Sequence, residues 1–131
     1  DVYKRQGINL DGVQWGTMID TVLNKPFAVV SSDWISNHPN FNAYIFKNRS
    51  LSDFYSAKIL NSGHASFMDM PLLINLPLIT ESGSIDSETS FEITNKMVLG
   101  FFDRYLRNKQ TDLIDLKNIH PEFEIELLYN N

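Results

Sequence analysis

With 131 residues, of which 43% are hydrophobic and 21% charged, the chain is long enough for one globular domain with a core. Its net charge of −5 argues against nucleic acid as a partner, because phosphate binding needs clustered Lys and Arg. There is no cysteine, which excludes disulfides, thiolate metal sites and a cysteine nucleophile but leaves the cellular compartment open.

The ends of the chain carry little information on targeting. No apolar run is long enough to span a bilayer, and no signal peptide opens the chain. Residues 1–6 are charged and differ in character from the rest of the chain, so we treat them as non-native sequence or as a remnant of upstream sequence. Because the first residue is not Met, we expect the true start to lie upstream.

Three segments have the character of strands. Residues 7–12 are short and apolar and end in Asp-Gly, which indicates a strand followed by a turn. Residues 27–32 form a continuous apolar run typical of a strand buried in a parallel sheet, and Asp33 follows its carboxyl end. Residues 54–60 predict a third strand.

Helical spacing appears between and after these strands. Short helices are expected over residues 17–24, 41–49 and 66–73, and residues 87–108 predict the longest helix. Thr89 with Glu92 fits a capping box, with Asp86 and Ser87 as alternative caps. The apolar stripe of this helix comprises Met97, Val98, Phe101, Phe102, Tyr105 and Leu106.

The last part of the chain has a different period. Phe123, Ile125 and Leu127 alternate with glutamates, a pattern that predicts a half-exposed strand or an extended arm. The alternation of strands and helices before it predicts an α/β fold with a short parallel sheet of about three strands flanked by helices. About three strands is few for such a domain, so we expect one open edge, with the missing strands N-terminal.

The residue with the strongest chemical signal is His64. It follows Gly63 directly after the third predicted strand, and the carboxyl ends of strands are where α/β sheets bind ligands. Histidine serves as a general base near neutral pH because its ordinary pKa lies there. We therefore predict that His64 is a catalytic base.

Four stretches together resemble the C-terminal half of an α/β-hydrolase, and they are most similar to the platelet-activating-factor acetylhydrolase family of serine esterases. The resemblance covers roughly residues 7–106. It is carried by residues 7–11, which match the strand ending in the triad aspartate, by residues 26–32, by the His-x-x-Phe-x-Asp pattern of residues 64–69, and by residues 83–86 with the helix after them. The resemblance implies that His64 and Asp11 belong to a Ser-His-Asp triad and that the substrate is a small ester or a phospholipid-like molecule.

The nucleophile that this resemblance requires is absent from the sequence. Serine esterases of this fold carry it in a Gly-x-Ser-x-Gly elbow before the acid and the base, and no such motif occurs here. We expect residues 7–108 to be the C-terminal part of the hydrolase domain, residues 109–131 to be an extension, and the N-terminal half of the fold to be missing. The chain alone should be inactive.

Two carboxylates compete for the role of the acid. Asp11 ends the first strand and is favoured by the family resemblance, whereas Asp33 ends the second strand, where many α/β-hydrolases carry the acid. Only geometry decides a triad, so Asp33 remains the alternative to Asp11. Trp15, Trp34 and Phe67 lie beside these residues and are candidates for a substrate pocket, although aromatic side chains more often belong to a core.

Other functions are compatible with the same residues. A self-contained binding or interaction module would use His64 and Asp11 structurally, and a peptidase of the same superfamily would use them catalytically. No His, Asp or Glu set has the spacing of a metal site, so we predict neither a metal nor a cofactor.

Overall fold

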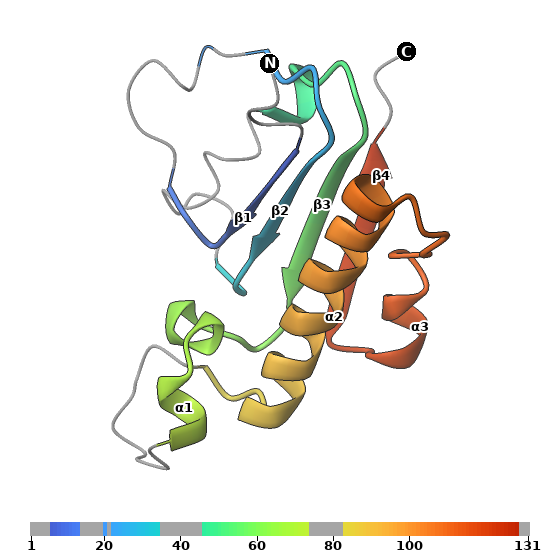
Figure 1. Ribbon diagram of the computed structural model, residues 1–131. Helices are drawn as coiled ribbons and strands as arrows, with labels where there is room; N and C mark the ends of the chain where they lie inside the picture. The colour runs from blue at the N-terminus through green and yellow to red at the C-terminus, as the bar shows by residue number, and fades with distance from the viewer. Residues whose placement is uncertain (1–5, 14–19, 21, 35–45, 74–82, 129–131) are drawn as a thin grey trace.

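The structure is a computed structural model that describes residues 6–13, 20, 22–34, 46–73 and 83–128. A sheet with the strand order β1-β2-β3-β4 forms one layer, and the long helix α2 lies across one of its faces (Figure 1). This is the α/β architecture predicted from the alternation of strands and helices.

Three neighbouring strands are parallel. They are β1 (Gly7–Leu10), β2 (Phe27–Ser31) and β3 (Phe54–Ile59), and Gly7 aligns with Phe27, which aligns with Phe54. Each begins within a residue of its expected position. Because the strands are parallel and in this register, their carboxyl ends all reach the same edge of the sheet.

A fourth strand extends the sheet beyond the parallel part. β4 (Phe123–Leu128) pairs with β3 in the antiparallel sense, from Phe54 with Leu128 to Ile59 with Phe123. The half-exposed strand predicted from its alternating residues is confirmed, because Phe123 and Ile125 are buried and Glu124 and Glu126 are exposed. The sheet therefore has one strand more than the predicted short parallel sheet.

The helix α2 (Ser87–Arg107) begins after a side-chain cap. Asp86 is the N-cap residue, because its carboxylate accepts a hydrogen bond from the Thr89 N–H at 2.9 Å, so the expected capping box of Thr89 with Glu92 is wrong. The backbone N–H and the hydroxyl of Thr89 lower the pKa of the Asp86 carboxyl. The helix ends where Asn108 adopts a left-handed conformation, with φ 52°.

The main core lies between α2 and the sheet. On α2 its fully buried side chains are Ile93, Met97 and Phe101, whereas Leu106, expected in the stripe, is 57% exposed. The sheet contributes Ala28 and Val30 from β2, Tyr55, Ala57 and Ile59 from β3, and Phe123 and Ile125 from β4. This packing fixes α2 against β3 and β4.

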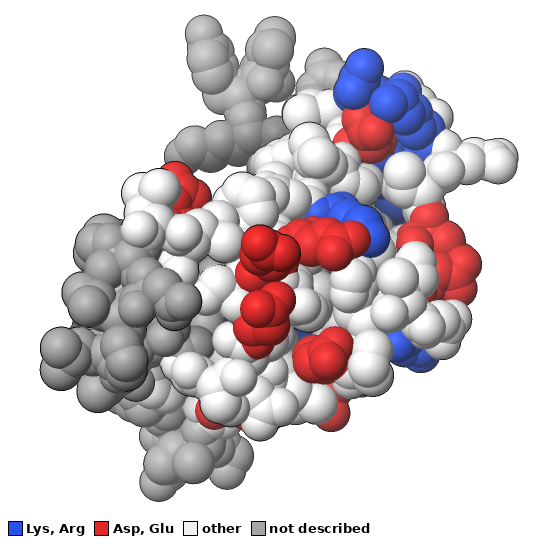
Figure 2. Space-filling view, turned by 90° about the horizontal axis from the view of Figure 1, so that it is seen from below, with Lys and Arg blue, Asp and Glu red and all other residues white. Residues whose placement is uncertain are grey.

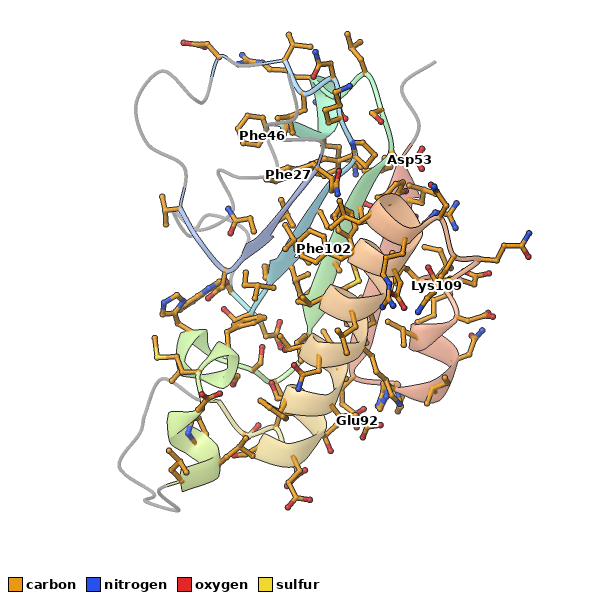
Figure 3. All side chains as sticks on the ribbon, viewed as in Figure 1. Phe27, Phe46, Asp53, Glu92, Phe102 and Lys109 are labelled. Carbon is orange, nitrogen blue, oxygen red and sulfur yellow. The ribbon has the colours of Figure 1, made fainter. Side chains whose placement is uncertain are left out.

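A second, smaller cluster covers the opposite face near the amino ends of the strands. Phe27 and Phe46 lie side by side with ring centroids 6.1 Å apart and planes tilted by 58° (Figure 3). Phe54 stacks on Phe27. At the same end, the hydroxyl of Tyr105 on α2 donates a hydrogen bond to Asp53. Burial, followed by the hydrogen bonds with Asp53 and Tyr55, raises the pKa of the Tyr105 phenol.

Short helices come after the third strand. A single helix was expected over residues 66–73, but the chain forms the 3₁₀ helix η3 (His64–Phe67) and then α1 (Met70–Leu73), both at the carboxyl edge of the sheet (Figure 1). The helix α3 (Leu116–Ile119) precedes β4.

Residues 17–19, 21 and 41–45 of two further expected helices lie outside the described residues. The helix expected over residues 17–24 is wrong at its end, because residues 22–24 are not helical and Leu23 forms a β-bridge with Ser50. In the segment expected as a helix over residues 41–49, residues 46–48 form a 3₁₀ turn. In the described part of the chain, no helix combines the length and hydropathy needed to cross a membrane.

Candidate active site

Asp11 is positioned by the turn that ends β1. Its backbone is left-handed, with φ 53°, and its N–H donates to the Val30 carbonyl of β2 at 2.8 Å. The Asn9 side chain closes the turn by bonding both the N–H and the carbonyl of Gly12, at 2.6 and 2.9 Å. Aspartate tolerates this conformation better than most residues. The result is a carboxylate at the carboxyl edge of the sheet that is only 2% exposed.

Three donors from the end of β2 hold the Asp11 carboxylate. The Ser32 N–H donates to Oδ1 at 2.9 Å, and the Ser32 hydroxyl donates to Oδ2 at 2.8 Å. The Trp34 indole N–H lies 2.8 Å from Oδ1 and 3.0 Å from Oδ2. Hydrogen bonds of this kind make it possible to bury a carboxylate in its ionised form.

The ring of His64 also contacts the Asp11 carboxylate. Its Nδ1 lies 2.8 Å from Oδ2 of Asp11, although the two residues are 53 positions apart in the chain. The Asp11 side chain is fully buried, whereas the His64 side chain is 41% exposed. Because an ionised carboxylate only accepts hydrogen bonds, Nδ1 carries the proton and Nε2 has a free lone pair. Among the described residues, nothing forms a hydrogen bond with Nε2.

The turn before His64 is fastened to the segment that leads into α2. Asn61 is left-handed, with φ 58°, and its carbonyl accepts the N–H groups of Ser84 and Ile85 at 2.8 and 3.0 Å. Gly83 has φ 74°, and a Cβ atom there would lie 2.1 Å from the Asn61 oxygen, so only glycine fits this approach. These contacts give the histidine loop a fixed backbone.

The loop is also tied to α2 itself. The Ser66 hydroxyl accepts the Gly63 N–H at 3.3 Å, and the Ser66 carbonyl accepts the hydroxyl of Ser90 on α2 at 3.3 Å. Ser66 and Ser90 are both buried. The loop that carries His64 is therefore bonded to the core helix.

Asp33, the alternative acid, lies elsewhere. Its carboxylate accepts the Asn61 N–H at 2.9 Å and lies 3.8 Å from Nζ of Lys58, and its own N–H donates to the Ser62 carbonyl at 3.1 Å. It therefore fastens the end of β2 to the histidine turn, and the described contacts of the His64 ring are with Asp11 alone.

The three aromatic residues considered for a substrate pocket have different locations. Trp34 directs its indole N–H at Asp11, Phe67 is half-buried and packs against the main core, and Trp15 lies outside the described residues. Sequence reasoning missed the contribution of Ser32. The signal was a polar pair, Ser31 and Ser32, at the carboxyl end of an otherwise apolar strand.

The described surface at the end of the molecule where η3 and α1 lie carries separate charged side chains (Figure 2). Seen from the end where η3 and α1 lie, Asp and Glu side chains are spread over the described surface, and Lys and Arg gather mainly toward one edge (Figure 2). Asp11 adds no surface charge because it is buried. Within the described residues, no group of three or more His, Asp or Glu side chains is arranged to hold a metal ion.

The comparisons with known proteins concern the fold. No protein-family model and no curated protein matches the sequence. Among solved structures, the chain is similar to a ferulic acid esterase from Streptomyces cinnamoneus, with a TM-score of 0.76 and 23% sequence identity over 92% of this chain. It spans 39% of the length of that esterase chain. The similarity shows that the two chains share an α/β fold, and the platelet-activating-factor acetylhydrolase family is not shown.

Proposed function

We propose that this chain is the C-terminal part of a serine ester hydrolase and supplies the acid, Asp11, and the base, His64, of its Ser-His-Asp triad. The observation that carries the proposal is the 2.8 Å contact between Nδ1 of His64 and Oδ2 of Asp11. The similarity to an esterase fold supports it at the level of the architecture.

The burial of the two side chains supports these roles. In a triad the carboxylate stays ionised, fixes the tautomer of the imidazole and stabilises the imidazolium that forms during the reaction. A buried Asp11 with three donors suits that task, and an exposed His64 ring whose Nε2 has a free lone pair suits proton exchange. Both features are expected of a catalytic pair.

The reaction follows the usual order of a triad. Nε2 of His64 takes the proton of the serine hydroxyl as its oxygen attacks the ester carbonyl, and the protonated ring then gives that proton to the departing alcohol. The acyl-enzyme is hydrolysed in the same way, with water in place of the serine. Asp11 stays ionised throughout and holds the proton on Nδ1.

The serine and the oxyanion hole must come from outside these 131 residues, because the sequence contains no Gly-x-Ser-x-Gly elbow. We therefore propose that the chain is inactive alone and that it acts together with the N-terminal half of the same fold. Without the nucleophile and the oxyanion hole, very little of the catalytic power of a triad remains.

The proposed substrates are small carboxylic esters or short-chain phospholipid-like esters. Because the structural neighbour is a ferulic acid esterase, feruloyl esters should also be tested as substrates. Turnover of acetyl, feruloyl and short-chain phospholipid esters, with an anilide to test for a peptidase, would rank these classes.

The experiment is fluorophosphonate labelling and ester turnover of the complete protein that contains this chain. We expect the wild type to be labelled at one serine. His64→Ala should lower kcat by roughly 10⁴-fold or more, and Asp11→Asn by about 10³- to 10⁴-fold.

The matched control is Asp103→Asn, since Asp103 is a surface aspartate paired with Arg107 and Lys109. It should keep the labelling and the turnover of the wild type. Full turnover in His64→Ala and Asp11→Asn would refute the proposal and favour a binding module.

A further inference from the structure

Residues 32–34 directly follow β2, and their side chains alternate between Asp11 and the turn before His64. Ser32 and Trp34 bond the Asp11 carboxylate, whereas Asp33 between them bonds the turn before His64. A tight turn, in which the Trp34 N–H donates to the Ser32 carbonyl at 2.9 Å, brings the two Asp11 partners together. We call the Ser32 N–H, the Ser32 hydroxyl and the Trp34 indole N–H the carboxylate clamp.

We propose that Trp34, as part of the carboxylate clamp, is a positioning residue that sets the orientation and the basicity of Asp11 and thereby the pH range in which His64 works as a base. This inference rests on the proposed function, because the clamp influences catalysis only if His64 carries protons during the reaction. It replaces the pocket-lining role that the sequence suggested for Trp34.

The indole N–H of Trp34 is shared between the two oxygens of the Asp11 carboxylate. The distances from Nε1 of Trp34 to the two carboxylate oxygens differ by little, 2.8 Å to Oδ1 and 3.0 Å to Oδ2. A rotation of the carboxylate about its Cβ–Cγ bond would lengthen at least one of these contacts. The Ser32 donors add one bond to each oxygen, so the clamp resists rotation and keeps Oδ2 directed at Nδ1 of His64.

The carboxylate clamp also affects how strongly Asp11 attracts a protonated His64. The Asp11 side chain is fully buried, so its negative charge is stabilised by the hydrogen bonds of the protein rather than by bulk water. Each donor of the clamp withdraws part of that charge from the bond with His64. If the indole N–H is removed, the remaining charge attracts the imidazolium more strongly. His64 then stays protonated to higher pH, so the neutral ring that the reaction needs forms only at a higher pH.

The sharpest variant replaces Trp34 by benzothienylalanine, which has nearly the shape of tryptophan and a sulfur in place of the N–H. Trp34→Phe is the simpler variant, and Ser32→Ala removes a second donor. All are made in the complete protein, and two properties are measured: the pH profile of kcat/KM for an acetyl ester, and the NMR signals of the His64 ring.

We expect the benzothienylalanine variant to lower kcat by about tenfold, the size of one hydrogen bond to a charged group, with KM nearly unchanged. The acid limb of its pH profile should move to higher pH, and the Nδ1 proton of His64 should move downfield as its bond to Asp11 strengthens. Ser32→Ala should shift both readouts in the same direction.

Two results would overturn the inference. One is an unchanged pH profile and ring proton in the benzothienylalanine variant, and the other is a loss of activity in Trp34→Phe that benzothienylalanine restores, since the ring and not the N–H would then matter. Failure of the proposed function is recognised separately, by full turnover in His64→Ala. In that case the NMR signal still shows whether the clamp controls the Asp11–His64 bond.

Discussion

At the scale of single residues, two aspartates at neighbouring strand ends have different tasks because their backbones differ. Asp11 is left-handed and buried, and it reaches His64 past the end of the strand between them. Asp33 is more exposed and bonds the backbone of the histidine turn. We infer that one aspartate orients the base and the other holds the loop that carries it.

This division predicts different effects of the same substitution. Asp11→Asn removes the negative charge and supplies an amide N–H that can donate to Nδ1, which favours the wrong tautomer of His64, so kcat should fall by about 10³- to 10⁴-fold. Asp33→Asn keeps an oxygen that can accept the Asn61 N–H, so kcat should fall by no more than about tenfold, the value of a weakened hydrogen bond. Ester turnover of the two variants checks this, and a larger loss in Asp33→Asn than in Asp11→Asn would reverse the two assignments.

At the scale of elements, α2 is the support on which the histidine loop rests. Its inner face is buried against the sheet, whereas Leu99 on its outer face is 67% exposed. Met97→Ala should therefore lower the free energy of unfolding by about 2–5 kcal/mol through the cavity it leaves. Leu99→Ala is the matched control and should change it by less than about 1 kcal/mol. Urea unfolding would measure both, and equal effects would contradict the packing described for α2.

Because the N-cap of α2 is the ionisable residue Asp86, we expect the stability of the folded state to depend on pH in the acid range. The Thr89 N–H and hydroxyl lower the pKa of Asp86 below its ordinary value of 3.8, so the folded state gains stability from the ionised cap above that pH. This contribution is lost as the pH falls through the lowered pKa of the folded state. Asn can cap a helix but does not ionise, so Asp86→Asn should show a smaller loss of stability than the wild type between about pH 5 and pH 2.

Urea midpoints at several pH values would measure this difference. Asp86→Ala, which removes the cap altogether, should be less stable than the wild type at neutral pH. If the wild type and Asp86→Asn lost stability in parallel on acidification, the cap would not be the group that titrates.

At the scale of the whole molecule, local patterns in the sequence predict the elements well and their partners poorly. The apolar run of β2, the Asp-Gly turn after β1 and the alternation in β4 each reflect burial or backbone conformation at that position, so they are visible in one short window. The partner of His64 depends on strand order and register across 53 residues, which is why the sequence alone leaves Asp33 as an alternative. The hydrogen bond of the Trp34 indole has no local signal at all.

The role of residues 109–131 is also a property of the whole molecule. The sequence suggests an extension, yet Leu113, Leu116, Phe123 and Ile125 are buried in the main core and β4 pairs along all of β3. We expect a chain that ends at residue 108 to lose cooperative unfolding, because it would expose Ile59 and Tyr55 on β3. Thermal unfolding followed by circular dichroism checks this, and an unchanged cooperative transition would show that the segment is dispensable.

The most direct measurement for the central proposal is the structure of the complete protein after fluorophosphonate labelling. We predict that the serine carrying the label lies outside these 131 residues and that, in the unlabelled protein, its Oγ lies within about 2.6–3.2 Å of Nε2 of His64. A labelled serine remote from His64, or a complete protein in which no serine hydroxyl approaches Nε2, would contradict the assignment of Asp11 and His64 to a catalytic triad.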